Sequence, residues 1–234
     1  MDKLIRYFTP VFLALLFLDI YVKTNLPIIP YRYYSKILVL VTLIIFTGYC
    51  VYKKNKLNNR YVFYGLIIFF IGDILIIDHL NKVKFIISLI LFVIGKLIYI
   101  FKFTHKEDFS NKRLLPFLAV CFLSVAFLYN LIFVNLKGYF IPVTLYFFIS
   151  LVMTLFAYLR KDVASNKSYY TVLSGVVLFV FSEATMVVKT FYGDILFQDF
   201  IVMFGYGFGQ YLIILGLMID KPNYVVNSDL ISKV

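Results

Sequence analysis

The stretch GLIIFFIGDILII, at residues 65–77, sets one aspartate inside an otherwise apolar run, and this pattern decides the class of fold. Three further apolar runs likewise contain a charged or amide residue: FVIGKLIYI at residues 92–100, SGVVLFVFSEATMVVKTF at 174–191 and YGFGQYLIILG at 206–216. Each run is apolar over most of its length but carries charged or amide side chains that are costly to bury in lipid. Together they indicate membrane-spanning helices that retain a few polar residues for a specific reason.

The composition of the chain agrees with a membrane protein. Of its 234 residues, 62% are hydrophobic and only 15% are charged, and the mean hydropathy is +0.92. A helix that crosses about 30 Å of hydrocarbon needs roughly 20 residues, so eight spans with short connections use nearly all of the chain. We therefore expect an all-α integral membrane fold of eight transmembrane helices, in one polytopic domain over residues 1–234 of a multi-pass cell-membrane protein. The expected spans are residues 6–22, 35–52, 61–78, 84–103, 114–134, 139–159, 169–189 and 199–219.

The net charge of +11 raises the question of a nucleic-acid partner. The basic residues lie in short clusters between apolar segments and build no continuous basic face, which favours anionic lipid headgroups over nucleic acid. Cys50 and Cys121 both fall inside expected spans, which argues against a disulfide framework. Two histidines without a Cys/His cluster argue against a structural zinc site.

The distribution of basic residues predicts the orientation of the chain. With eight spans both termini lie on one side, and that side holds fifteen of the 23 lysines and arginines. The opposite side holds seven: Lys23, Arg32, Lys36, Lys82, Lys84, Lys137 and Lys189. Because connections rich in Lys and Arg remain inside, we expect both termini in the cytoplasm.

Four polar residues lie deep inside expected spans. At 1.5 Å per residue, Asp73 and Glu183 lie roughly 18 to 21 Å from the cytoplasmic end, and Lys96 and Gln210 about 16 to 18 Å from the other end. A charge at mid-bilayer costs on the order of 2.5 to 3.5 kcal/mol, so such residues usually face a bundle interior or cavity. Lys96 could pair with a carboxylate purely as structure. Two acids and a lysine at one depth favour a functional site, with the third, fourth, seventh and eighth spans around one polar cavity. Nearer the outer boundary, four more polar residues are expected at the interface: Asp19, Asp78, His79 and Lys189.

The chain also shows signs of an internal repeat. Glu183 follows Asp73 by 110 residues, and a glycine precedes each acid by eight residues. Lys96 corresponds to Gln210 at an interval of 114, because a glycine stands directly before each. These matches suggest possible repeats at residues 1–105 and 106–220, whose pseudo-twofold axis along the membrane normal would bring the two acids face to face.

The four quoted runs resemble the YhhN family, which comprises membrane lysoplasmalogenases, and the resemblance extends over the whole eight-span layout. Gly72 and Asp73 match the Gly-Asp pair of the family, and Tyr99 matches the tyrosine that closes its fourth-span motif. Gln210 and Tyr211 fit the motif of the eighth span.

Three positions depart from the family pattern and mark the chain as a divergent member. Glu183 stands where an aspartate is usual, and Lys96 stands where a histidine is usual. Gly207 replaces the second member of a tyrosine pair. Acid chemistry survives the change from Asp to Glu more easily than a site survives the change from His to Lys, so these departures bear on the substrate more than on the reaction.

The resemblance implies hydrolysis of the vinyl-ether bond of a lysolipid, giving a fatty aldehyde and a glycerophospho-alcohol. This reaction suits the two acids, because protonation of the vinyl carbon needs one neutral carboxylic acid and capture of the oxocarbenium ion by water is helped by one carboxylate. Low dielectric and mutual repulsion would keep one acid neutral while Lys96 keeps the other ionised. The reaction needs no metal or other cofactor. We expect Asp73 and Glu183 to be catalytic, and the residues that bind or orient the lysolipid substrate to be Lys96, Tyr99, Ser182, Tyr206 and Gln210.

The alternative is a non-enzymatic transporter or lipid carrier. Intramembrane Asp, Glu and Lys residues and an internal repeat are equally expected in transporters. Release of aldehyde by the purified protein in detergent separates the two functions, because transport needs a sealed compartment.

Overall fold

The computed structural model describes residues 2–27, 29–53, 59–78, 81–104 and 111–220. The helices are α1 Asp2–Asn25, α2 Tyr31–Gly48, α3 Arg60–Ile76, α4 Lys82–Phe103, α5 Asn111–Leu136, α6 Phe140–Leu159, α7 Asn166–Phe191 and α8 Gln198–Ile219. A π-helical turn, Tyr49–Lys53, extends α2, and short 3-10 turns, Lys137–Tyr139 and Arg160–Asp162, flank α6. Over these ranges the structure contains helices and no strands, which confirms the all-α prediction.

Seven helices in the described part of the chain are long and apolar enough to cross a membrane. The remaining long helix is α3, which has 17 residues and carries Asp73. A span of this length stands at the lower limit of what crosses a bilayer. The structure thus supports a multi-pass membrane protein with seven candidate spans, and the membrane crossing of α3 stays a prediction.

Short polar caps set the beginnings of two helices that carry site residues. The side chain of Asn81 accepts hydrogen bonds from the backbone N–H groups of Val83 and Lys84 at the start of α4. The hydroxyl of Ser165 accepts from the N–H of Ser168 at the start of α7. Such caps satisfy N–H groups that have no partner within the helix. They fix where each helix begins and hence the depth of its polar residues.

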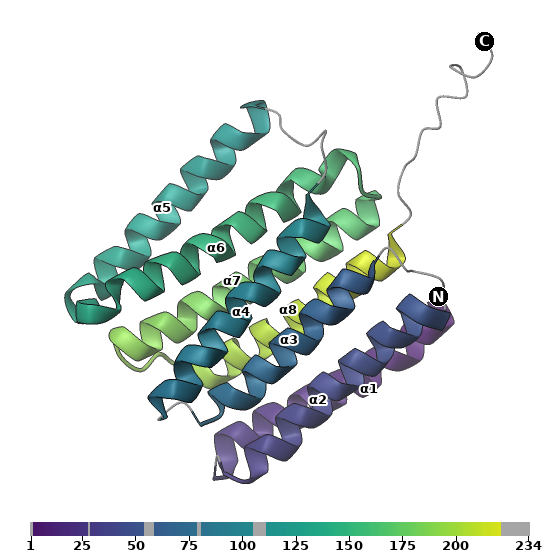
Figure 1. Cartoon of the computed structure of the whole chain (residues 1–234), viewed down its shortest axis with the longest axis horizontal. Helices are drawn as coiled ribbons and strands as arrows, with labels where there is room; N and C mark the ends of the chain where they lie inside the picture. The colour runs from purple at the N-terminus through teal and green to yellow at the C-terminus, as the bar shows by residue number, and fades with distance from the viewer. Residues whose placement is uncertain (1, 28, 54–58, 79–80, 105–110, 221–234) are drawn as a thin grey trace.

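The centre of the bundle consists of two closely packed helix pairs, α3 with α4 and α7 with α8, with α1 and α2 at one edge and α5 and α6 at the other (Figure 1). Glycines permit the contact between α7 and α8. A Cβ atom at Gly175 would lie 2.7 Å from the carbonyl oxygen of Gly209, and one at Gly209 would lie 2.8 Å from that of Gly175. Small residues of this kind let membrane helices approach backbone to backbone.

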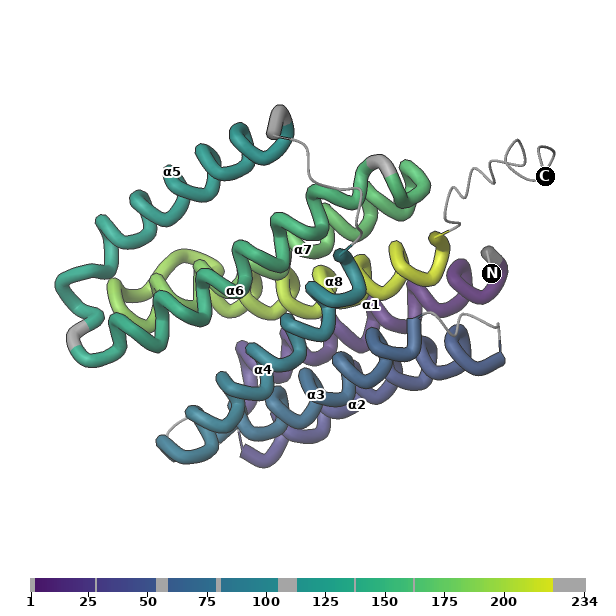
Figure 2. The backbone as a smooth tube through the Cα atoms, turned by 45° about the horizontal axis from the view of Figure 1, so that its top comes forward, coloured from purple at the N-terminus to yellow at the C-terminus, as the bar shows by residue number. Residues whose placement is uncertain are grey.

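Helix α5 stands partly apart from the other helices (Figure 2). Its second half packs on α6 and α7 through a small apolar cluster, Leu128, Ile132 and Leu136 with Phe147 and Val187. Its first half leaves large apolar side chains exposed, among them Leu115, Leu118, Val120, Phe122 and Leu123. Lipid chains are as apolar as these side chains, so a surface of this kind suits a membrane environment.

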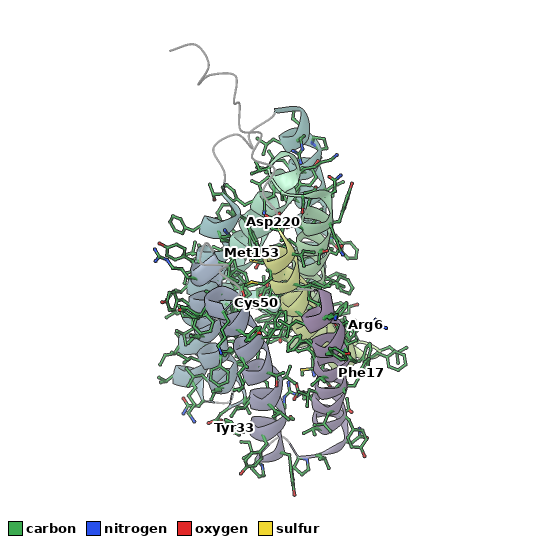
Figure 3. The ribbon with its side chains drawn as sticks, turned by 90° about the vertical axis from the view of Figure 1, so that its right-hand side faces the viewer. Arg6, Phe17, Tyr33, Cys50, Met153 and Asp220 are labelled. Atoms are coloured by element: carbon green, nitrogen blue, oxygen red, sulfur yellow. The ribbon has the colours of Figure 1, made fainter. Side chains whose placement is uncertain are left out.

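The ends of the bundle are distinguished by the chain order. The start of α1 and the end of α8 lie at the same end (Figure 1), and Tyr33 and Asp220 lie toward opposite ends (Figure 3). This arrangement is the one expected for an even number of antiparallel helices. Which end faces the cytoplasm stays a prediction from the basic residues.

Candidate active site

A cavity of about 70 Å³ lies among α2, α3, α4, α6, α7 and α8. It is lined by Lys36, Asp73, Ile76, Phe92, Tyr146, Ser182, Glu183, Met186, Val202, Met203 and Tyr206. Lys36 stands near the start of α2 and Ile76 is the last residue of α3, so the cavity lies toward the bundle end opposite the start of α1. Its volume accommodates several water molecules or a small group of a substrate.

Asp73 accepts two hydrogen bonds from different helices. Lys36 Nζ on α2 lies 2.6 Å from Asp73 Oδ1, and the hydroxyl of Tyr206 on α8 donates to Asp73 Oδ2 at 2.5 Å. The lysine nitrogen also lies 5.7 Å from the centre of the Tyr206 ring. We call Asp73, Lys36 and Tyr206 the Asp73 half-site.

Glu183 accepts three hydrogen bonds. Lys96 Nζ on α4 lies 2.7 Å from Glu183 Oε1, and the hydroxyl of Tyr146 on α6 donates to the same oxygen at 2.5 Å. The hydroxyl of Ser150 donates to Glu183 Oε2 at 2.7 Å and accepts a hydrogen bond from Lys96 at 2.7 Å. The Lys96 ammonium also lies 3.4 Å from the centre of the Tyr146 ring, a cation–π geometry. We call Glu183, Lys96, Tyr146 and Ser150 the Glu183 half-site.

Each acid therefore has its own lysine. The sequence pointed to Lys96 alone, and the structure adds Lys36 as a second lysine of the site. Two carboxylates and two ammonium groups leave the cluster without net formal charge, which is how buried ions become tolerable in a low-dielectric interior. The two acids line one cavity, but α2 and α6 line it together with the four expected helices, and most of its lining is apolar.

Three of the expected substrate-binding residues, Lys96, Tyr99 and Gln210, stand beside the cavity rather than in its lining. Tyr99 donates a hydrogen bond to Gln210 Oε1 at 3.0 Å, and both side chains are buried between α4 and α8. Gln210 Nε2 is buried without a hydrogen-bond partner among the described residues. Ser182 does line the cavity, but its hydroxyl donates to the backbone oxygen of Phe179 on its own helix at 2.8 Å. Tyr206 lines the cavity, whereas Lys96 reaches the site through Glu183.

Sequence reasoning missed Lys36, Tyr146 and Ser150. Lys36 was assigned to an outer connection, but it lies inside α2 with a side chain that is only 12% exposed. The charge balance contained a signal, because two buried acids need two cations and Lys96 supplies one. Tyr146 and Ser150 gave no signal, because tyrosine and serine occur widely in membrane helices without taking part in a site.

A second expectation also needs correction. Asp19 was expected at the interface, yet it is buried and bound by Arg32 at 3.0 Å and by the hydroxyl of Ser35 at 2.6 Å. The packing of α1 against α2 closes this group off from water. Two partly exposed pairs fit the interfacial expectation: Lys84 with Asp78 at 2.7 Å and Lys189 with Asp199 at 3.0 Å. His79 lies outside the described residues.

The comparisons with known proteins add one family. The chain matches the model of the YhhN family over residues 31–217, which is most of its length and includes every residue of the two half-sites. No curated protein and no solved structure matches the chain. The matched range begins at the start of α2 and ends two residues before the end of α8. The chain therefore belongs to the YhhN family.

Proposed function

We propose that this chain is a lysoplasmalogenase-like hydrolase, which cleaves the vinyl-ether bond of lysoplasmalogen-type lysolipids inside the membrane. Membership of the YhhN family supports a hydrolase at the level of the family. The observation that carries the proposal for this chain is that Asp73 and Glu183, from α3 and α7, line one cavity. A pair of carboxyl groups around one reacting bond is the arrangement that acid-catalysed cleavage of a C–O bond uses in glycosidases.

The reaction divides into two proton transfers. In the first, a carboxylic acid of the site gives its proton to the outer carbon of the vinyl ether, and the inner carbon becomes an oxocarbenium ion. The remaining carboxylate stabilises this cation, and a water molecule in the cavity adds to it. The proton lost by that water returns to the site, the hemiacetal collapses, and a fatty aldehyde and a glycerophospho-alcohol leave. In sum, one vinyl ether and one water give one aldehyde and one alcohol.

The cavity suits the reacting bond rather than the whole lipid. At about 70 Å³ it is far smaller than a lysolipid, so the single alkenyl chain must extend from it among the helices or into the bilayer. Its apolar lining, which includes Ile76, Phe92 and Met186, favours an uncharged vinyl ether over a charged group.

The test is aldehyde release from a vinyl-ether lysolipid by purified protein in detergent, compared with Asp73→Asn and Glu183→Gln. Both changes keep the side-chain shape and remove the ability to give and take a proton, so we expect turnover to fall about 10²- to 10⁴-fold. Asp199→Asn serves as a matched control, because this acid forms a partly exposed ion pair with Lys189 away from the cavity lining. The control should release aldehyde at the parent rate, and an ester lysolipid should not be cleaved.

The second candidate is a membrane transporter or lipid carrier. Buried ion pairs that line a cavity between helices are also what an ion-coupled transporter needs. Parent rates of hydrolysis in both amide variants, or no aldehyde release by the parent protein, would favour this alternative. Substrate uptake into sealed proteoliposomes would then be the measurement to make.

A further inference from the structure

The contacts of the two acids repeat along the chain at one interval. Tyr146 follows Lys36 by 110 residues, Glu183 follows Asp73 by 110, and Tyr206 follows Lys96 by 110. At this interval, each acid has one partner from its own half of the chain and one from the other half, and Ser150 is an additional partner of Glu183. Asp73 is bound by Lys36 and Tyr206, and Glu183 is bound by the residues at the corresponding positions.

The lining of the cavity follows the same interval. Met186 follows Ile76 by 110 residues, and Val202 follows Phe92 by 110. Residues near a twofold axis contact their own equivalents. Phe69 and Phe179, also 110 apart, do so, with ring centres separated by 5.8 Å.

The site is thus built from two equivalent half-sites, each with one carboxylate, one amine and one phenol. The sequence match of Lys96 with Gln210 at an interval of 114 does not fit these contacts. In the structure, Lys96 is instead equivalent to Tyr206, because each binds the acid of the other half of the chain. Both amines therefore come from the first half and both phenols from the second. Because the half-sites are equivalent, the hydrogen bonds and exposure of each residue can be compared with those of its equivalent in the other half-site.

The half-sites differ in their access to water. Lys96 is fully buried, and Ser150 adds a third hydrogen bond to Glu183. The residue equivalent to Ser150, at the same interval of 110, is Leu40, which has no hydroxyl to offer. Lys36, in contrast, lines the cavity and has a side chain that is 12% exposed. Lys36 contacts Asp73 on α3 and Tyr206 on α8, shares the cavity lining with Glu183 on α7, and lies close enough to Lys23 on α1 for the two ammonium groups to repel.

We propose that Lys36 delivers the proton that Asp73 gives to the substrate, and this inference rests on the proposed hydrolase function. The Lys36 ammonium transfers a proton to Asp73, whose carboxylic acid then protonates the vinyl carbon. Once a bound lipid displaces all but the reacting water, a neutral acid and amine become competitive with the ion pair, because charges are costly in an apolar cavity. Capture of water by the oxocarbenium ion releases one proton, which restores the ammonium and closes the cycle. Glu183, held by three donors, remains the carboxylate that stabilises the cation.

Two substitutions separate proton delivery from charge. Lys36→Arg keeps a positive charge beside Asp73, but a guanidinium does not release a proton in proteins. Lys36→Met removes both the charge and the proton. We expect both variants to lose turnover on the order of 10²-fold, with KM changed far less than kcat. Lys84→Met is the matched control, because this lysine pairs with Asp78 at the same end of the bundle but is partly exposed, and it should retain the parent kcat.

Chemical rescue of turnover by an added amine distinguishes proton delivery by Lys36 from a purely structural role of this residue. Lys36→Ala leaves space beside Asp73, and methylammonium, which carries a transferable proton, should restore turnover in a saturable manner. Tetramethylammonium carries the charge without a transferable proton and should not restore it. Rescue also shows that the variant is folded.

The outcomes distinguish this inference from the proposed function. Parent turnover in Lys36→Arg, or equal rescue by tetramethylammonium, overturns proton delivery and leaves a purely electrostatic role. Loss of turnover in Asp73→Asn together with full activity in Lys36→Met overturns this inference while the hydrolase function stands. Absence of aldehyde release by the parent protein overturns both.

Discussion

The two half-sites place the same chemical groups in different surroundings. Glu183 lies among three donors, and its lysine is sealed from water, whereas Asp73 has two donors and a lysine that reaches the cavity. A carboxylate whose hydrogen bonds all come from buried donors keeps its charge and position. A carboxylate with fewer donors, beside a lysine that is exposed to the cavity, can exchange its proton. The difference teaches that a symmetric frame can supply two acids with opposite tasks.

The largest expected difference between the half-sites concerns stability. Lys96→Met removes the cation from a fully buried pair and leaves Glu183 as an uncompensated charge, which typically costs about 3 to 5 kcal/mol. Lys36→Met should cost less, because Lys36 is 12% exposed and its pair with Asp73 is therefore less completely removed from solvent than the pair of Lys96 with Glu183. The measurement is thermal unfolding of both variants in one detergent. Equal losses would contradict the difference in burial between the two lysines.

Removal of either phenol hydroxyl, that of Tyr206 or that of Tyr146, is expected to have a smaller effect, which concerns the rate of aldehyde release. A hydrogen bond to a charged group contributes about 1.5 to 3 kcal/mol. Tyr206→Phe leaves Asp73 with one donor, so we expect aldehyde release to fall on the order of tenfold. Tyr146→Phe should reduce it less, because Glu183 retains Lys96 and Ser150.

The control for both phenol variants is Tyr129→Phe. Its hydroxyl bonds Thr144, away from the cavity, and its loss should leave the rate unchanged. Steady-state kinetics on the three variants decide the order. A greater loss in Tyr146→Phe than in Tyr206→Phe would reverse the roles assigned to the two acids.

Much of the fold could be predicted because charges and breakers bound the apolar segments. The expected spans 169–189 and 199–219 correspond to α7, Asn166–Phe191, and α8, Gln198–Ile219. The chain's family was likewise predictable from its motifs, and the match over residues 31–217 confirms it. The orientation of the termini and the membrane crossing of α3 depend on the bilayer, so they stay predictions.

The site was predictable only where burial in lipid made a residue conspicuous. Asp73 and Glu183 stood out because an acid in an apolar run needs a reason. Lys36 did not, because a lysine near a helix end normally snorkels to the headgroups, and only the packing of α2 on α3 turns it inward. Tyr146 acquires its role solely through the contact of α6 with α7, which no local pattern encodes.

The last expected effect tests whether the two halves are packed with equal tightness. Gly65 and Gly175 are equivalent at the 110-residue interval, but their neighbours differ. A Cβ at Gly175 would lie 2.7 Å from the backbone oxygen of Gly209, which cannot move without shifting α8. At Gly65 the nearest atom would be in the Tyr99 ring, at 3.0 Å, and a side chain can give way. We therefore expect Gly175→Ala to lower the free energy of unfolding by about 1 to 3 kcal/mol, and Gly65→Ala to lower it less.

Gly138→Ala is the control for this pair, because a Cβ there meets nothing within 4 Å, and its stability should equal that of the parent. Thermal unfolding in detergent measures all three variants. A loss in Gly65→Ala as large as that in Gly175→Ala would mean that Tyr99 cannot yield. Tyr99 is held by its hydrogen bond to Gln210, so that result would place rigidity at the Tyr99–Gln210 contact as well as at the α7–α8 backbone. The Asp73 half-site would then be supported as firmly as the Glu183 half-site, and the difference between them would rest on solvent access alone.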